Sequence, residues 1–577
     1  MDVGLTCAVW RAFVQAREYL EAASVQEAIT AALGHVIKER PTNPVKALGN
    51  FLVQQEEKRE EAKMLGEIAT MTGPEGFDYV IVCCSNLAAE NYWQKRLEAT
   101  VKEVTGAAAT VLCVHEDWNG GAGNGLGTLY AFHKAANKAA ASGIDLGAQM
   151  GRGASVALYH TAGKGTRMAP LPGAENNNKP GVKLPSLISV GGELQPITVL
   201  ECVMRQTSSY APARKARCSV FWGDQIFVPS CGIEPSTFPA DILAALRPMP
   251  SKAEWEAEEL HQYGLIAVDP RGAATQLEKV TYDVATAYLP ADVERVGTSL
   301  GSFSLSAPLM EALLAEFAPE LEGKTASLDS DPHFWMPLTL KQADYVAVMT
   351  KKGTSVEEAT AHFSRMADFR ARFDPTGSPI LACVDVGTNA HWWDYGRLGL
   401  YFENNLLLAE QSASAHALRT FLGLHPYRQQ ESKVADSAAV DESSVLLKCK
   451  VGGGKVGKGC VLVNVCAPSV DIEGCILVNV TSSVPIVGRG GLLYNVVHEA
   501  AEGSLDCSAV RADVFMPGSH LQMMSDRETD GGKAWKVKLE GNPESFEGVY
   551  KINQSLDVGE CTALAMQSHA DARAKMP

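Results

Sequence analysis

A glycine loop with two basic residues near it is the stretch of this sequence best suited to binding a phosphorylated substrate. An apolar run over residues 156–160, predicted to be a strand, leads into Gly163 and Gly165. Glycines let consecutive backbone N–H groups turn toward one point, where they attract an anion. Arg167 and Lys179 can neutralise the same phosphates from two sides. The stretch predicts a triphosphate cradle, although a turn that merely needs glycine is the commoner structure for a Gly-x-Gly sequence.

Three aspartates are candidates for holding a divalent cation. Asp224 follows a predicted strand over residues 218–222, and the carboxyl end of a parallel strand faces the ligand side of its sheet. Asp394 and Asp385 lie in two similar settings further along the chain. Carboxylate oxygens suit Mg²⁺, which takes its other ligands from water and phosphate. The residues alone leave the partner of Asp224 open between Asp394 and Asp385.

The glycine loop resembles the signature loop of the sugar-1-phosphate nucleotidyltransferases. The likeness rests on Ala-Gly-Lys-Gly-Thr-Arg-Met at 162–168, on Lys179 and on Leu184-Pro185, with extra residues at 173–178 as the departure. That family joins a nucleoside triphosphate to a sugar 1-phosphate and releases pyrophosphate. The resemblance implies that Arg167 and Lys179 are catalytic. It implies that the nucleotide is bound by Ala162, Gly163, Gly165 and Thr166.

A second stretch, residues 392–405, is similar to the family pattern W-x-D-x-G-T-L-x-x-Y-x-x-x-N, except that Arg397 replaces the threonine. The flanking tryptophan, leucine, tyrosine and asparagine also match. The resemblance therefore favours Asp394 over Asp385, and it implies that Mg²⁺ is held by Asp224 and Asp394.

The base and the sugar are assigned to two further segments by the same resemblance. Residues 77–135 have the pattern of a strand, a helix, a strand, a glycine-rich loop and a helix, which predicts a parallel sheet. Gly127 and Thr128 resemble the base-side loop, with a flexible surface loop as the alternative. The sugar side is assigned to Gly264, Glu278 and Lys279, with a surface ion pair as the alternative for the last two.

The order of these blocks differs from that in most of the family, because the base-side block precedes the phosphate loop. A similar order occurs in fucose-1-phosphate guanylyltransferases, so we interpret it as a circular permutation that keeps the same site.

The N-terminal residues predict two short amphipathic helices. Ser24 and Glu27 form a capping box for a helix over residues 25–40, prolines break it, and an apolar stripe restarts at Val45. Residues 33–52 resemble the dimerisation-and-docking motif of protein kinase A regulatory subunits and their Dpy-type relatives. This implies a homodimer through residues 24–55 and a groove for a partner's amphipathic helix. A small helical cap on the enzyme is the alternative.

A short internal repeat begins after about residue 440. Similar apolar segments start at Val445, Val461, Ile476 and Leu492, which are 16, 15 and 16 residues apart. Such a period predicts a β-helix-like solenoid whose coils bury one another, a tail that the nucleotidyltransferases often carry. The last eighty residues have no assignable pattern.

Composition and net charge limit the kinds of partner and the cellular compartment to expect. The chain has 577 residues, of which 46% are hydrophobic and 20% charged, and a net charge of -16. An acidic protein is a poor partner for nucleic acid or an anionic membrane, so neither is expected. The fourteen cysteines show no zinc-binding spacing. We expect a cytoplasmic protein, or one attached to a cilium or flagellum at the axoneme.

The sequence therefore predicts an α/β protein with a Rossmann-like, glycosyltransferase-A-like nucleotidyltransferase sheet. The predicted parts are a helical dimerisation segment at 1–70, a catalytic domain at 71–425 and a β-helix-like domain at 430–577. The expected reaction transfers a nucleotidyl group from UTP to glucose 1-phosphate with Mg²⁺. The alternatives are a fucose-1-phosphate guanylyltransferase, a catalytically weak scaffold in a ciliary or other large assembly, and a glycosyltransferase, which would usually carry a second aspartate at Ile226.

Overall fold

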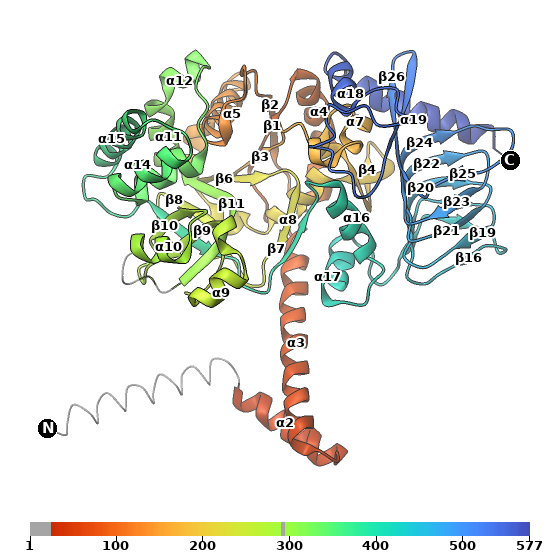
Figure 1. The fold of residues 1–577 in the computed structure, drawn as a ribbon, viewed down its shortest axis with the longest axis horizontal. Helices are drawn as coiled ribbons and strands as arrows, with labels where there is room; N and C mark the ends of the chain where they lie inside the picture. The colour runs from red at the N-terminus through yellow and green to blue at the C-terminus, as the bar shows by residue number, and fades with distance from the viewer. Residues whose placement is uncertain (1–24, 290–292, 294, 577) are drawn as a thin grey trace. The chain divides into compact units, whose positions relative to one another are not determined.

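The computed structural model describes residues 25–289, 293 and 295–576, and shows a mixed α/β protein with parallel sheets and N-terminal helices (Figure 1). The chain divides into two compact units, residues 1–66 and 67–577. None of the helices in the described ranges is both long enough and apolar enough to cross a membrane.

The first unit consists of helix α2 (Val25–Glu39) and most of helix α3 (Pro44–Thr70). The Asn43 side chain accepts the Lys46 N–H at 3.0 Å and so caps the start of α3. The His35 and Phe51 rings stack at 4.6 Å and join the two helices. The predicted capping residue Ser24 lies outside the described residues.

Helix α3 is longer than the sequence pattern predicted. Helix α3 has 27 residues and includes the highly charged residues 56–63. Glutamate, lysine and glutamine are good helix formers, and no proline interrupts the run. The second of the two predicted short helices is therefore a long one.

A nine-stranded sheet forms the centre of the second unit. Strands β1, β2, β3 and β6 are parallel in the order β2-β1-β3-β6, and β6 pairs antiparallel with β11. The alternation of short apolar strands with helices predicted this parallel core. The strands of the sheet are β1 (Tyr79–Cys84), β2 (Thr110–His115), β3 (Val156–His160), β6 (Arg217–Trp222), β8 (Ala240–Pro248), β9 (Gly264–Val268), β10 (Ala274–Glu278), β11 (Arg295–Ser306) and β12 (Leu381–Asp385).

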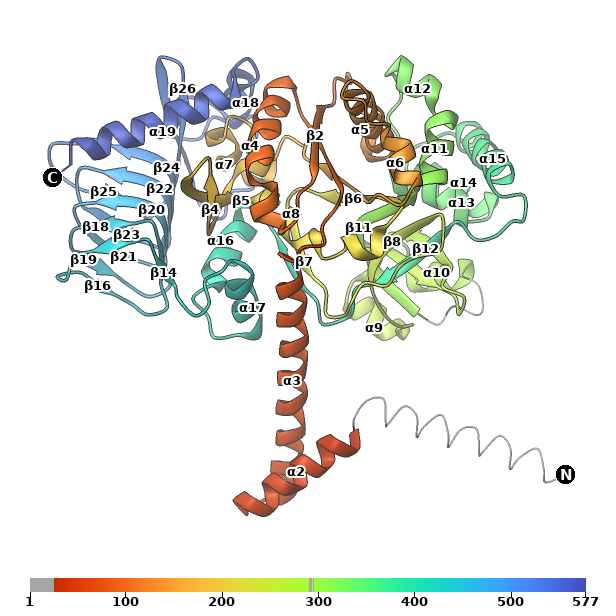
Figure 2. The same ribbon diagram turned by 180° about the vertical axis from the view of Figure 1, so that it is seen from behind.

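Helices cover both faces of the parallel strands. Figures 1 and 2 show α4 and α8 on one side of β1, β2 and β3, with α5 and α11 on the other. The α5 side buries a large apolar cluster that includes Leu126, Leu129, Phe317 and Trp335. The helices of this region are α4 (Leu87–Thr105), α5 (Gly123–Ala140), α6 (Leu146–Gly151), α7 (Leu171–Ala174), α8 (Val199–Ser208), α9 (Lys252–Ala257), α10 (Tyr282–Tyr288), α11 (Ala307–Glu316), α12 (Ala318–Gly323), α13 (Met336–Thr339), α14 (Gln342–Lys351), α15 (Val356–Phe373), α16 (Leu398–Leu407) and α17 (Ala413–Phe421).

Two small antiparallel pairs lie beside the main sheet. Strands β4 (Lys183–Val190) and β5 (Glu193–Thr198) form one pair, and β7 (Gln225–Val228) and β13 (His391–Asp394) form the other. Two short 3₁₀ turns lie between the glycine loop and β4, namely η1 (Thr166–Met168) and η2 (Lys179–Gly181).

Stacked coils, here called the coil region, follow the α-helices from residue 429 to residue 516. The predicted repeat is confirmed, because Val445, Val461, Ile476 and Leu492 occupy equivalent positions in parallel strands of successive coils. One sheet contains β14 (Gln429–Gln430), β15 (Lys433–Val434), β17 (Val445–Leu447), β18 (Lys450–Val451), β20 (Val461–Ala467), β22 (Ile476–Ser482), β24 (Leu492–His498) and β26 (Val510–Met516). The other contains β16 (Ala439–Val440), β19 (Gly454–Val456), β21 (Val470–Glu473), β23 (Ile486–Arg489) and β25 (Leu505–Asp506).

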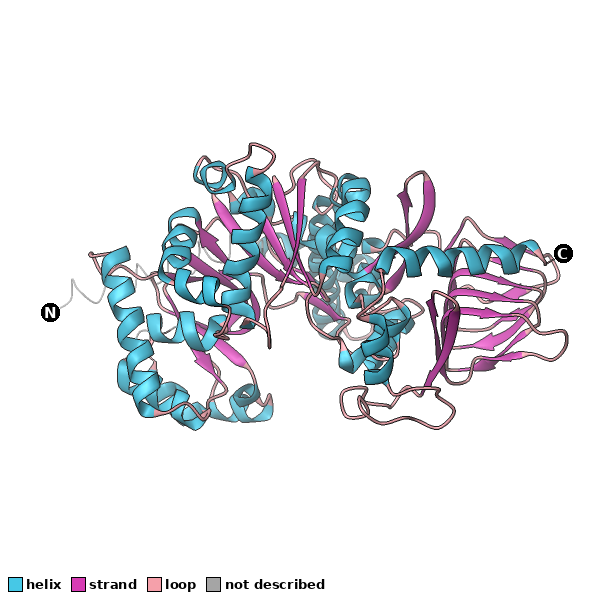
Figure 3. Cartoon of the chain, turned by 90° about the horizontal axis from the view of Figure 1, so that it is seen from above, coloured by secondary structure: helices cyan, strands magenta, loops and turns pink. Residues whose placement is uncertain are grey.

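The C-terminal residues, which showed no sequence pattern, are ordered on this framework. Strand β27 (Ser519–Ser525) pairs antiparallel with β26, and the helices α18 (Phe546–Asn553) and α19 (Val558–Ala574) follow. Figure 3 shows α19 running along the stacked strands of the coil region. Its Arg573 donates to the Asn464 carbonyl at 3.0 Å, which joins the last helix to a coil more than a hundred residues earlier.

Candidate active site

The carboxyl ends of four parallel strands meet at one edge of the main sheet. Strands β1, β2, β3 and β6 run in the same direction, so the segments that follow β2, β3 and β6 all begin at this edge. These segments carry the predicted base-side glycines, the predicted phosphate loop and Asp224. The fold thus gathers residues that the sequence separates by about one hundred positions.

A cleft of about 420 Å³ opens at this edge. That size lies in the range of about 300–1,000 Å³ that is typical of small-molecule sites. The cleft is lined by Glu116, Gly123, Asn124, His160, Thr161, Ala162, Gly163, Lys179, Pro180, Trp222, Gly223 and Asp224. Four of the sequence-predicted residues, namely Ala162, Gly163, Lys179 and Asp224, are among them.

Lys179 crosses the glycine loop to reach Asp224. Gly165 has a φ of 66°, and a Cβ atom added to it would lie 3.0 Å from the Lys179 Cδ atom. The Lys179 ammonium forms an ion pair with the Asp224 carboxylate, and the two side chains are 16% and 19% exposed. A glycine is therefore favoured at position 165 for two reasons: the backbone is left-handed there, and the Lys179 side chain passes close to where a Cβ atom would lie.

Asp394 lies beside Asp224 because β13 pairs with β7. Asp394 is opposite Gln225 in this antiparallel pair, and the Tyr395 N–H donates to the Asp224 carbonyl at 2.9 Å. A Cβ atom added to Gly396 would lie 2.9 Å from Asp394 Oδ1 and 3.1 Å from Asp224 Oδ2. The two carboxylates therefore converge on one point above Gly396.

Asp385, the rival of Asp394, has a different role in the structure. Its Oδ1 accepts the N–H groups of Leu246 at 3.1 Å and Gly387 at 2.9 Å, and its Oδ2 is 3.4 Å from the Arg295 guanidinium. The Gly387 bond closes the turn after β12, and the other two contacts join this turn to β8 and β11. Neither Asp385 nor Asp394 is among the lining residues of the cleft, but Asp394 approaches Asp224, which is one of them. The structure brings Asp394, and not Asp385, to Asp224.

Burial and a neighbouring carboxylate shift the pKa of Asp394 in the same direction. Burial raises the pKa of Asp394 above its ordinary value, the Asp224 carboxylate adds to this, and the Gly396 N–H, Lys179 and Arg167 oppose it. Two nearby carboxylates favour a cation between or beside them, because neutralising either one relieves their repulsion.

The metal-binding capacity of the cleft rests on this pair. Across residues 25–289, 293 and 295–576, no group of three or more histidine, cysteine, aspartate or glutamate side chains could hold a metal ion. Two carboxylates suit Mg²⁺ when a phosphorylated substrate and water complete the coordination. They would be too few for a resident structural metal, which is normally bound by about four protein ligands.

Arg167 lies on the exposed turn η1 and is packed by C-terminal residues. A Cβ atom added to Gly532 would lie 3.5 Å from the Arg167 Cγ atom and 3.8 Å from Thr166 Oγ1. The Lys164 ammonium lies 5.6 Å from the centre of the Tyr550 ring. The glycine loop is thus supported by a segment almost four hundred residues later, a contact that no sequence pattern indicated.

Glu116 and His160 are cleft residues that sequence reasoning missed. His160 Nε2 and Thr128 Oγ1 are 2.9 Å apart, and the His160 ring stacks with Trp222 at 5.4 Å. Burial lowers the pKa of His160 to about 4, so its ring is neutral at physiological pH, and burial raises the pKa of Glu116. Glu116 directly follows β2, and His160 ends β3. Their positions at strand ends were the available signal.

The predicted base-side residues lie inside helix α5. Gly127 and Thr128 occupy its second turn, and a Cβ atom added to Gly127 would lie 3.2 Å from Glu116 Oε2. The N–H groups of Gly125 and Leu126 donate to the Leu328 carbonyl at 2.9 and 3.1 Å. These helix donors are therefore engaged within the chain, and Gly123 and Asn124 are the parts of α5 that reach the cleft.

The predicted sugar-side residues lie on the hairpin of β9 and β10. Gly264 is opposite Glu278 in this hairpin, and the Lys279 N–H donates to the Tyr263 carbonyl at 3.1 Å. Strand β11 pairs with β9 over residues 295–298 and with β6 over 303–306. The start of β9 and the end of β6 therefore lie end to end beside the middle of β11. The Glu278 side chain lies outside the described part of the structure.

The first unit has a recognisable relative. Residues 15–57 match the family model of the Dpy-30 motif, a dimerisation and docking module. Residues 15–24 of the match lie outside the described residues, while α2 and the first half of α3 contain the rest. No curated protein matches the chain.

Proposed function

We propose that the chain is a sugar-1-phosphate nucleotidyltransferase whose active site is the cleft at the ends of β2, β3 and β6. The observation that carries the proposal is the meeting of the glycine loop, Lys179, Asp224 and Asp394 at one edge of a parallel sheet. Together with the sequence resemblance, this meeting of residues supports a Rossmann-like nucleotidyltransferase fold for residues 71–425. A β-helix-like domain would then occupy residues 430–577.

The carboxylate pair fits the metal that this reaction needs. Asp224 and Asp394 approach the same point above Gly396, and their repulsion contributes to the raised pKa of Asp394. Mg²⁺ held by these two residues would neutralise charge on the α-phosphate and the sugar phosphate. The Lys179 ammonium pairs with Asp224 at the same place.

The remaining residues position and neutralise the phosphates. The backbone N–H groups of residues 162–166 form the cradle for the triphosphate. Lys179, which passes Gly165 and reaches Asp224, would neutralise charge on the transferred phosphate, and Arg167, an exposed residue after the glycine loop, would stabilise the leaving pyrophosphate. Phosphoryl transfer depends mainly on positioning and charge neutralisation, so no covalent intermediate with the protein is required.

The substrates follow from the resemblance rather than from the cleft. UTP and glucose 1-phosphate are the first choice, and GTP and fucose 1-phosphate are the alternative suggested by the block order. Gly264, Glu278 and Lys279 would bind the sugar, since the start of β9 lies beside the end of β6.

The direct test is pyrophosphate release by the full-length chain with Mg²⁺ and each pair of nucleoside triphosphate and sugar 1-phosphate. One pair should react, and Asp224→Asn should abolish the reaction while the thermal unfolding curve stays cooperative. If no pair releases pyrophosphate above the rate of Asp224→Asn, the chain is not a nucleotidyltransferase and the scaffold alternative replaces it.

A second function, docking, is supported by the match to the Dpy-30 motif. The first unit exposes large apolar side chains, with Ile29, Leu33 and Ile37 on α2 being 42%, 48% and 71% exposed. Two chains paired through residues 24–55 would cover such surface and would form a groove for an amphipathic helix of an anchoring protein. The enzyme would then work in the cytoplasm at an anchored position, for example at a ciliary or flagellar axoneme.

A further inference from the structure

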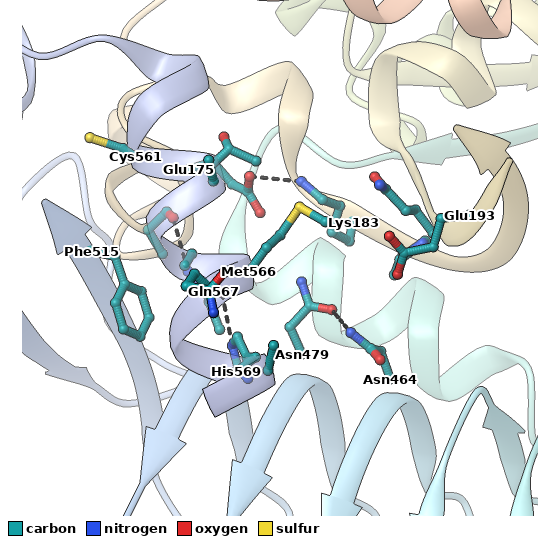
Figure 4. Close-up of a pocket in the computed structure, with 18 of the residues that line it drawn as sticks. Glu175, Lys183, Glu193, Asn464, Asn479, Phe515, Cys561, Met566, Gln567 and His569 are labelled. Atoms are coloured by element: carbon teal, nitrogen blue, oxygen red, sulfur yellow. Dashed lines mark hydrogen bonds and ion pairs between the residues drawn. The ribbon is translucent and has the colours of Figure 1, made fainter. Parts of the chain in front are cut away.

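A second cavity, separate from the cleft, lies where the coil region, α19 and the segment after the glycine loop meet (Figure 4). Its volume is about 490 Å³, and it shares no lining residue with the cleft. Figure 4 shows Asn464 and Asn479 projecting from neighbouring coils on one side and Glu175 and Lys183 on another. Met566 extends from α19 toward Lys183.

Amide side chains dominate the polar lining. Asn464, Asn479 and Asn495 occupy one position in three successive coils, each with a φ between 50° and 57°. Asparagine tolerates this left-handed backbone better than other residues with a Cβ atom. The Asn464 Nδ2 donates to Asn479 Oδ1 at 2.8 Å, while Asn464 Oδ1 is buried without a partner among the described residues.

Asn176 is a stronger sign that the cavity takes a ligand. It is only 6% exposed, and within the described structure neither polar atom of its side-chain amide has a hydrogen-bond partner. Its φ of 54° lies in the left-handed region. A buried amide without a hydrogen-bond partner is destabilising, so the site favours a molecule that supplies hydroxyl groups.

The charges of the lining leave one cation uncompensated. Arg96 pairs with Glu201 at 2.9 Å, Lys183 with Glu175 at 2.7 Å and Lys448 with Glu193 at 3.1 Å. Arg573, the fourth lining cation, bonds to the Asn464 carbonyl and to Thr481 Oγ1, and no carboxylate of the described residues lies within ion-pair distance.

The histidine of the lining adds no positive charge. Burial lowers the pKa of His569 to about 3, so its ring is neutral at physiological pH. The lining therefore carries a surplus positive charge beside unpaired amide groups.

We infer that this cavity binds a small polyhydroxylated anion of the sugar-phosphate class. Arg573 would meet the phosphate, the amides of Asn176 and Asn464 would meet the hydroxyl groups, and Phe515 and Met566 would cover the apolar face of the sugar. The inference does not depend on nucleotidyl transfer, because binding here needs neither the cleft nor a nucleotide.

The test is isothermal titration calorimetry on the full-length chain with glucose 6-phosphate, fructose 6-phosphate and ribose 5-phosphate. Free glucose and inorganic phosphate separate the contributions of the hydroxyl groups and the anion. At least one sugar phosphate should bind, and more tightly than either of these two probes. Absence of binding by all three sugar phosphates at about 10 mM would overturn the inference, as would equal affinity for inorganic phosphate.

Two variants locate the binding. Arg573→Gln removes the unpaired charge and should weaken binding by about tenfold or more. Ala570→Phe adds bulk from an exposed position of α19 that lines the cavity, and it should abolish binding without removing any buried group. The matched control is Arg489→Gln, which changes a half-exposed arginine of the coil region outside the cavity and should leave binding unchanged.

A third variant tests whether the sugar phosphate binds in the cleft instead of the second cavity. Lys179→Ala should retain sugar-phosphate binding, because Lys179 lines only the cleft. Loss of binding in Lys179→Ala, or full binding in both Arg573→Gln and Ala570→Phe, would place the ligand in the cleft and refute the second site.

Discussion

The Lys179 ammonium is ion-paired with the Asp224 carboxylate, although the two residues are 45 positions apart. The pair is mostly buried and lies against Gly165. Because Asp394 approaches Asp224, a lysine and a second carboxylate meet at one of the residues that line the cleft. This arrangement gives the proposed reaction its metal ligands and its main cation, and the following predictions test it.

Removing either carboxylate should abolish Mg²⁺-dependent pyrophosphate release. Asp224→Asn and Asp394→Asn keep the side-chain size, so the fold should persist while turnover falls by several orders of magnitude, as expected for loss of a metal ligand. The measurement is pyrophosphate release at saturating Mg²⁺, with circular dichroism to verify folding.

Asp385→Asn is the matched control for the carboxylates. It disturbs the turn after β12, where Asp385 accepts two backbone N–H groups, so it should reduce stability but not the rate per folded molecule. Full activity in Asp394→Asn together with loss of activity in Asp385→Asn would show that Asp385, and not Asp394, is the second metal ligand.

Removing the cations should lower turnover more than it weakens triphosphate binding. Lys179→Ala and Arg167→Ala should each reduce kcat by about a hundredfold or more, because their charge is needed most where negative charge builds up during transfer. Steady-state kinetics separates kcat from KM, and Lys215→Ala, on an exposed lysine outside the cleft, is the control. An unchanged kcat with a raised KM in both variants would make these cations ground-state binders.

Acidification should destabilise the second unit in part through His160. The pKa of His160 is lowered to about 4 by burial, below the ordinary 6.5, so the unfolded chain binds the proton more tightly. Stability is therefore lost as the pH falls from 6.5 toward 4, by about 2 kcal/mol at pH ~5 for this residue. Urea denaturation at pH ~7.5 and pH ~5 gives the difference.

Two histidine variants identify the source of that pH dependence. His160→Gln should have a smaller loss of stability between the two pH values than the wild type, while His133→Gln, at an exposed position of α5, should match the wild type. His569, which burial also keeps neutral, would account for part of the remaining slope. An identical slope in His160→Gln and the wild type would contradict the prediction.

A charge on the apolar face of α2 should weaken dimerisation. Leu33 is 48% exposed in the single chain, so Leu33→Asp removes little internal packing but places a carboxylate in the expected interface. The dimer dissociation constant should rise by about tenfold or more, since each buried leucine contributes about 1.5–3 kcal/mol. Light scattering over a concentration series measures this, with pyrophosphate release expected to stay unchanged.

A control variant and a shortened chain complete the dimerisation experiment. Gln54→Asp changes an exposed polar residue of α3 and should dimerise like the wild type. A chain that starts near residue 70 should be monomeric. If the shortened chain dimerises with the affinity of the full chain, the interface lies outside the first unit and the docking proposal fails.

The sequence by itself determined the features that depend on neighbouring residues. Alternating apolar strands and helices predicted the parallel sheet, and the glycine loop after residue 160 stands at its predicted place. The recurrence of Val445, Val461, Ile476 and Leu492 predicted the register of the coils. Each of these depends on backbone conformation and periodicity over a few residues, which local sequence specifies well.

Only the tertiary structure decided what depends on distant contacts. The approach of Asp394 to Asp224, which the resemblance favoured but no local pattern explains, follows from the pairing of β13 with β7, a contact between segments more than 160 residues apart. The second cavity exists because α19 returns to the asparagines of the coil region, and nothing in residues 558–574 indicates that destination. Such contacts depend on which surfaces bury one another across the whole fold, and a single sequence does not encode that information in any local pattern.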